Sequence, residues 1–167
     1  NGTTLAAMNL IRALRGKGHT VTILCPDAQK QGVSGYAVVP TRNLGIFNGY
    51  VKSNGVQLAK PDDAVIRQAI QGADIVHVML PFVLGRRAAQ LAKAQDIPVS
   101  AGFHAMAENF TSHIFMENCA PVNRLTYHVF SKTYKMVDAI HYPTQFLRDL
   151  YEKMYGPTNG YVISNGV

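Results

Sequence analysis

The chain has 167 residues, of which 47% are hydrophobic and 16% are charged, and its formal net charge is +6. This apolar content excludes a disordered chain, and the length fits one globular domain. No apolar run approaches the roughly 18–20 residues of a spanning helix, and the first residues carry no signal-peptide pattern. The distant cysteines Cys25 and Cys119 argue against a disulfide scaffold, so we expect a cytoplasmic protein. The positive charge favours an anionic partner: nucleic acid, a membrane surface or a phosphorylated ligand.

Apolar runs separated by stop signals predict alternating helices and strands. The predicted helices cover residues 5–15, 62–70, 85–94, 124–137 and a segment from the Thr144 cap to about residue 155; the predicted strands cover 21–25, 36–39, 75–80, 99–103, 139–142 and 161–163. Residues 41–61 are rich in Gly and Asn and predict a loop. Because the strands are continuous apolar runs separated by helices, we predict an α/β fold with a doubly wound parallel sheet, covered by helices on both faces.

Both ends of the sequence suggest a larger protein. A glycine turn that opens a helix normally follows a strand, yet Asn1–Gly2 begins the chain at such a turn. We therefore expect that a first strand is missing. Asn165–Gly166 is a turn that leads toward further chain.

Candidate site residues follow the predicted strands, since ligands of parallel α/β sheets bind outside the carboxyl ends of the strands. His104 lies just beyond strand 99–103 and is either a ligand contact or a loop histidine satisfied by backbone groups. Glu108 and Asn109 either line the same crevice or are solvated. His77, inside strand 75–80, is either a cleft residue or a satisfied core histidine.

The first helix offers a possible phosphate site. Gly2 and Thr3 precede it, and free N–H groups at a helix N-terminus attract phosphate; the alternative is an ordinary N-cap by Thr3 or Thr4. Neither a dinucleotide fingerprint nor a P-loop is present. The histidines show no metal-ligand spacing, so we expect neither a metal nor a cofactor.

Basic residues recur in the predicted helices and indicate either solvated faces or a membrane-facing surface. One group is the pair Arg86 and Arg87. In another, Lys132 and Lys135 are interleaved with the aromatic residues Tyr127, Phe130 and Tyr134. Basic and aromatic residues together are typical of a helix that lies on a membrane surface.

Five segments, taken in order, resemble the family 4 (group 1) glycosyltransferases. They are NGTT with LRGKGHTVTIL (1–4 and 14–24), DIVHV with PFVLG (74–78 and 81–85), IPVSAGFH (97–104), DAIHYPT (138–144) and VISNGV (162–167). The departures are Ala101 before Gly102, Thr144 for Ser and Ser164 for Pro. Each motif alone is weak, but five in order are specific.

The resemblance implies the GT-B fold, in which two Rossmann-like domains face each other across a cleft. Residues 1–167 would be the N-terminal, acceptor-side domain, without the C-terminal donor domain. The implied activity is retaining, metal-independent transfer of a hexose from a nucleotide-sugar, and this fragment alone is expected to be inactive.

By position in the motifs, His104 corresponds to the family's histidine near the transferred sugar, and Gly2 to the glycine that faces the donor pyrophosphate. Residues 81–85 and 104–110 are most similar to diacylglycerol glucosyltransferases. This similarity implies a lipid or glycan acceptor, no nucleic acid, and peripheral association with the anionic inner face of the cytoplasmic membrane. The alternative is a non-catalytic nucleotide- or sugar-binding Rossmann-like module.

Overall fold

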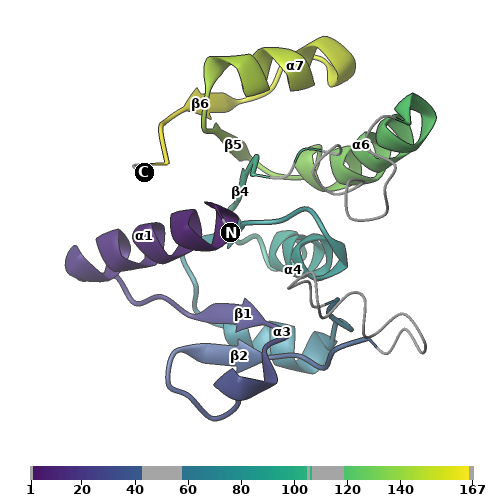
Figure 1. Ribbon diagram of the computed structural model, residues 1–167. Coiled ribbons are helices and arrows are strands. Elements are labelled where there is room, and N and C mark those ends of the chain that lie inside the picture. The colour runs from purple at the N-terminus through teal and green to yellow at the C-terminus, as the bar shows by residue number, and fades with distance from the viewer. Residues whose placement is uncertain (1, 43–57, 105, 107–118, 166–167) are drawn as a thin grey trace.

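The computed structural model describes residues 2–42, 58–104, 106 and 119–165. Figure 1 shows the helices and strands along the chain. The α-helices are α1 (Gly2–Gly16), α3 (Asp63–Ile70), α4 (Val83–Lys93), α6 (Ala120–Tyr134) and α7 (Gln145–Tyr155), with a short 3-10 helix η1 (Ala28–Lys30). The strands are β1 (Ile23–Cys25), β2 (Tyr36–Val38), β3 (Val76–Val78), β4 (Val99–Gly102), β5 (Ala139–Tyr142) and β6 (Gly160–Val162).

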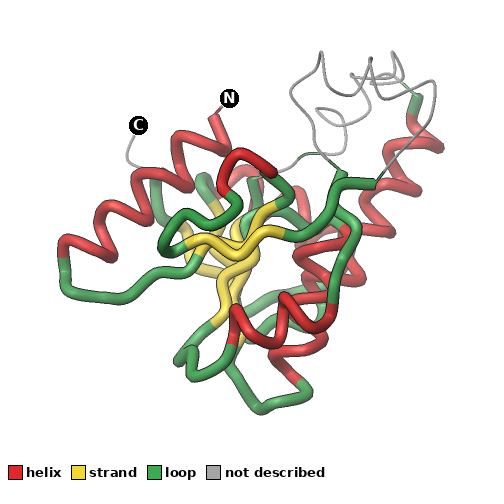
Figure 2. Tube along the Cα trace, turned by 90° about the horizontal axis from the view of Figure 1, so that it is seen from below, coloured by secondary structure: helices red, strands yellow, loops and turns green. Residues whose placement is uncertain are grey.

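The strands form two parallel sheets in the described part of the chain. β1 pairs with β2, and β3, β4, β5 and β6 pair in that order. Figure 2 shows the strands gathered at the centre with helices around them. The predicted α/β fold with parallel strands is therefore confirmed, although its strands lie in two sheets rather than one.

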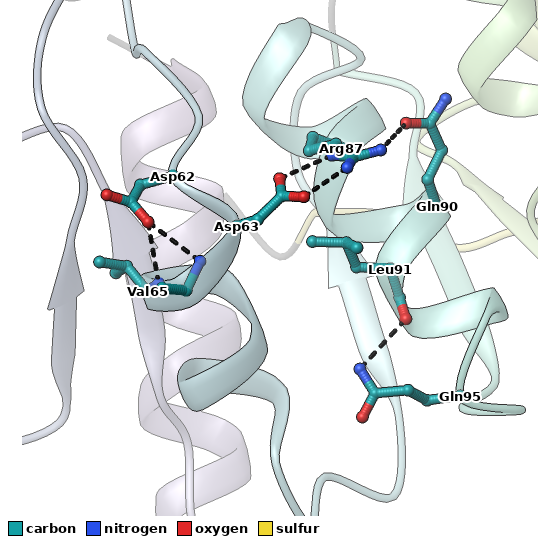
Figure 3. Close-up of polar contacts among 8 residues, drawn as sticks. Asp62, Asp63, Val65, Arg87, Gln90, Leu91 and Gln95 are labelled. Carbon is teal, nitrogen blue, oxygen red and sulfur yellow. Dashed lines mark hydrogen bonds and ion pairs between the residues drawn. The ribbon is translucent and has the colours of Figure 1, made fainter.

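Local signals explain where the helices begin and end. The Asp62 carboxylate accepts hydrogen bonds from the N–H groups of Ala64 and Val65, at 3.0 and 3.3 Å, and so caps α3 (Figure 3). The Thr144 hydroxyl accepts one from Leu147 N–H at 3.3 Å and caps α7, as predicted. Gly156, with φ of 88°, ends α7.

The main difference from the sequence prediction is the position of α6. It begins at Ala120, four residues before the predicted start, because Pro121 lies in its first turn, where proline costs no helical hydrogen bond. It ends at Tyr134 rather than at residue 137. Most of the predicted loop 41–61 lies outside the described residues; within it, Thr41 and Ala59 form an isolated antiparallel bridge.

The core lies between one face of the four-stranded sheet and the helices α4, α6 and α7, and it continues to α3, which packs against α4 and the two-stranded sheet. At its centre the fully buried Phe103 ring contacts the rings of Tyr134, Tyr142 and Tyr151, with centroids 5.2, 5.5 and 5.3 Å apart. Phe103 N–H also donates to the His141 carbonyl at 2.8 Å. This anchoring fixes the backbone just before His104.

Ion pairs join the helices at the periphery of this core. Arg87 of α4 donates from Nε to the Asp63 carboxylate of α3 at 2.7 Å, and its Nη2 bonds the other carboxylate oxygen (Figure 3). The Arg87 guanidinium lowers the pKa of Asp63. Because both side chains are more than a third exposed, this contact adds little to stability and serves mainly to orient α3 against α4.

Candidate functional site

Three histidines lie on one face of the four-stranded sheet, at its carboxyl end. The strand register pairs His77 of β3 with Ser100 of β4, and Gly102 of β4 with His141 of β5. Alternate residues of a strand point to the same face, so Ser100 and Gly102 share a face with their two histidine partners. His104 follows β4 two residues beyond Gly102. We call these residues, His77, Ser100, Gly102, His104 and His141, the histidine face.

His77 has one nitrogen paired and one nitrogen without a partner. Its Nδ1 lies 2.8 Å from Ser100 Oγ, whereas its Nε2 is buried and has no hydrogen-bond partner among the residues that the structure describes. Burial, reinforced by His104 and His141, lowers the pKa of His77 to about 4. His77 is therefore neutral at pH 7.

His104 is half-buried and packs against His141. The two rings meet edge to face, with centroids 5.5 Å apart and an interplanar angle of 76°. Burial is the larger cause, and His141 the smaller, of a pKa for His104 below its ordinary value. A neutral imidazole can both donate and accept a hydrogen bond, which suits it to contact with hydroxyl groups.

His141 is held by the chain that follows β6. Its Nε2 lies 2.5 Å from the carbonyl oxygen of Ile163. A carbonyl only accepts, so His141 Nε2 carries a proton and donates it. This bond fixes the ring against which His104 packs.

The structure brings together two of the predicted site residues, His77 and His104, on the histidine face. Gly2 and Thr3 lie in the first turn of α1, which begins at Gly2 rather than at the predicted residue 5, so Thr3 is a helical residue and not the N-cap. A β-carbon built on Gly2 would meet no described atom within 4 Å. Glu108 and Asn109 lie outside the described residues.

Sequence reasoning missed Ser100, Gly102 and His141 as parts of this site. Ser100 and Gly102 precede His104 by four and two residues, the period of one strand face, and this spacing is a signal in the sequence itself. The place of His141 depends on which strand pairs with β4, and no local pattern contains that information.

The predicted membrane-facing surface on α6 needs correction. Tyr127, Phe130 and Tyr134 are each only 3% exposed and belong to the core. Their spacing of three and four residues puts them on one helical stripe, and Lys132 lies on the opposite, exposed stripe. The aromatic rings therefore cannot face a membrane. On α4, Arg87 is engaged by Asp63.

The described residues hold no group of three or more His, Cys, Asp or Glu side chains placed to bind a metal ion. Within the same residues, no helix is both long and apolar enough to cross a bilayer. Cys25 and Cys119 are free thiols.

The described residues form an α/β domain with polar side chains at the carboxyl ends of its parallel strands. This arrangement places the chain in the class of Rossmann-like domains. The family model described as Glycosyltransferase Family 4 matches residues 1–167, and the chain belongs to that family. It therefore represents one Rossmann-like half of a GT-B fold. No curated protein and no solved structure matches the chain.

Proposed function

We propose that this chain is the acceptor-side domain of a retaining glycosyltransferase that moves a hexose from a nucleotide-sugar donor to a lipid or glycan acceptor. The family membership supports sugar transfer. The observation that carries the choice of site is the position of His104, a half-buried imidazole at the carboxyl end of β4 with a pKa below its ordinary value. A second, donor-binding domain completes the site in this proposal.

In this proposal the histidine face positions the sugar. The bond between the sugar and the nucleoside diphosphate breaks, and the acceptor hydroxyl attacks the anomeric carbon on the same side while its proton passes to an oxygen of the departing diphosphate. His104 holds a sugar hydroxyl throughout. A second contact, from the buried Nε2 of His77, requires the surroundings of that atom to open when the sugar binds. The N–H groups of Gly2 and Thr3 face the diphosphate, whose growing charge the N-terminus of α1 stabilises. The reaction needs no metal or cofactor, because preorganised donors meet that charge.

Replacing His104 in the whole protein tests the site. His104→Ala is expected to lower kcat about 10²–10³-fold, the usual cost of one preorganised polar contact in a transition state. Transfer would be measured with labelled UDP-glucose and GDP-mannose, offered with diacylglycerol vesicles or soluble oligosaccharides. His19→Ala, at an exposed turn, is the matched control and is expected to keep full activity. Activity of His104→Ala within twofold of the parent would make His104 a structural loop residue.

The same assay distinguishes the alternative function. A non-catalytic nucleotide- or sugar-binding module would bind UDP-glucose or GDP-mannose and transfer no sugar to any acceptor. Isothermal titration with these donors, run beside the transfer assay, separates the two proposals.

The exposed stripe of α6 supports an anionic membrane as partner of a lipid transferase. Leu125 and Val129 are 63% and 45% exposed, and they lie among the exposed side chains of Arg124, His128 and Lys132. The helix has no acidic residue. Apolar side chains flanked by basic ones suit a surface of anionic lipid.

Vesicle co-sedimentation tests this partner. Each basic residue near an anionic surface contributes about 1 kcal/mol, so Arg124→Gln with Lys132→Gln is expected to weaken binding to phosphatidylglycerol vesicles about thirtyfold. Lys17→Gln with Lys153→Gln makes the same charge change elsewhere and is expected to have little effect. Equal binding to phosphatidylglycerol and phosphatidylcholine vesicles at low salt would remove the lipid acceptor and leave a soluble glycan.

A further inference from the structure

The space above Gly102 is filled by the ring of His104. A β-carbon built on Gly102 would lie 2.3 Å from His104 Nε2 and 2.4 Å from its Cδ2, and the three nearest atoms all belong to His104. Carbon atoms do not approach that closely without a shift of one of them. The His104 ring therefore folds back over the strand in a position that only glycine permits.

The backbone of Gly102 does not itself require glycine. Gly102 lies in β4 and is not among the glycines with positive φ. A side chain would suit its conformation, and the clash that a β-carbon would make is with the neighbouring His104 ring. This separates Gly102 from Gly72 and Gly156, whose φ values of 71° and 88° favour glycine for backbone reasons.

His141 is the second residue that holds the His104 ring in place. It is the register partner of Gly102 on β5, and its ring meets the His104 ring edge to face. The bond from His141 Nε2 to the Ile163 carbonyl fixes the His141 ring. Gly102 thus lies beneath the His104 ring and His141 beside it.

We propose that Gly102 is a positioning residue that holds the His104 imidazole over the end of β4, against His141. This inference rests on the proposed function for its catalytic consequence, but the placement of the ring can be measured without it. A methyl group at position 102 would force the ring off the strand toward solvent and leave the buried face of β4, formed by Ala101 and Phe103, in place.

The first test follows the ring directly in the whole protein. Histidine resonances labelled at Cε1 would be titrated by NMR, and the His104 signal would be assigned from its loss in His104→Gln. In Gly102→Ala the His104 pKa is expected to rise to the ordinary value, because the ring leaves its half-buried seat. An unchanged His104 titration in Gly102→Ala would overturn the proposal.

Gly85→Ala provides a matched control. A β-carbon there would lie 2.3 Å from the Leu80 carbonyl oxygen, the same distance as at Gly102, but the atom it meets is backbone, which yields less readily than a side-chain ring. It is expected to lower stability and to leave the His104 titration unchanged. A His104 shift of the same size in both variants would show general loosening and would contradict a specific role for Gly102.

A double-variant cycle tests the coupling even where Gly102→Ala folds poorly. If the clash is with His104 alone, Gly102→Ala combined with His104→Ala regains the stability of His104→Ala. In the transfer assay, Gly102→Ala is expected to lower kcat at least tenfold in the parent and to have no effect when His104 is already alanine. Equal losses in both backgrounds would overturn the proposal, whereas loss of the proposed function would appear separately, as full activity of His104→Ala.

Discussion

The two faces of the four-stranded sheet come from alternate residues of the same strands, and they differ in chemistry. One face carries apolar side chains that are at most 3% exposed: Val78, Val99, Ala101, Phe103, Ile140 and Tyr142. The other is the histidine face, where small residues, Ser100 and Gly102, alternate with imidazoles. The first face stabilises the fold. The second face has smaller side chains, which leave room for polar rings beside the backbone. Adjacent residues of β4 therefore contribute to different faces, one to the core and one to the histidine face.

The comparison is tested most strongly at Phe103 and His104, which are neighbours in sequence. Phe103→Ala removes a ring packed against three tyrosines and is expected to cost about 3–5 kcal/mol of unfolding free energy, because the site cannot collapse to fill the cavity. His104→Ala is expected to cost less than about 1 kcal/mol, the usual range for a residue outside the core. Denaturant unfolding followed by circular dichroism measures both. Equal losses would mean that the two faces do not divide these roles.

The sequence predicted the elements of the buried face well, because buried segments are marked by runs of apolar residues that are close together in the sequence. The strand at 139–142 has its predicted bounds, and Thr144 caps α7 as expected. Continuous apolar runs and cap residues are read within a few neighbouring positions. The start of α6 was predicted too late, because Pro121 looks like a helix breaker until its place in the first turn is known.

The histidine face was predictable only in part, because it depends on pairing between distant segments. From position alone, His104 could be placed just beyond a strand end and His77 inside a strand. The bond of His77 to Ser100 joins residues 23 positions apart, and the bond of His141 to Ile163 joins residues 22 apart. Strand register fixes these partners, and hydrophobic periodicity reports which face a residue occupies without reporting which strand lies beside it.

The misassigned aromatic residues of α6 teach a related lesson. Tyr127, Phe130 and Tyr134 follow helical spacing, which already predicts a single stripe. The basic residues and these aromatic residues are close in sequence, but they lie on two stripes of the helix that face in opposite directions. Leu125 and Val129, which do share a stripe with Lys132, are the apolar residues that the helical period selects.

The pH dependence of stability sharpens the comparison, because burial lowers the pKa of His77 on the histidine face. The folded-state pKa of His77 is about 4, below the ordinary value of 6.5. Between these values the unfolded chain binds a proton that the folded chain does not, so stability is complete above pH 6.5 and falls as the pH drops toward 4. A difference of this size corresponds to about 3 kcal/mol for His77.

Replacing the imidazole isolates this contribution from those of the neighbouring histidines. His77→Gln keeps a polar side chain opposite Ser100 and cannot be protonated, so it is expected to lose less stability than the parent between pH 6.5 and 4. Unfolding free energies of both proteins, measured across that range, give the difference directly. Ser100→Ala is the control for the hydrogen bond: it is expected to cost about 1 kcal/mol at every pH and to leave the His77 titration in place. Parallel pH profiles for the parent and His77→Gln would show that His77 exchanges protons as freely as in the unfolded chain, and the histidine face would then be open to water rather than built around a neutral imidazole.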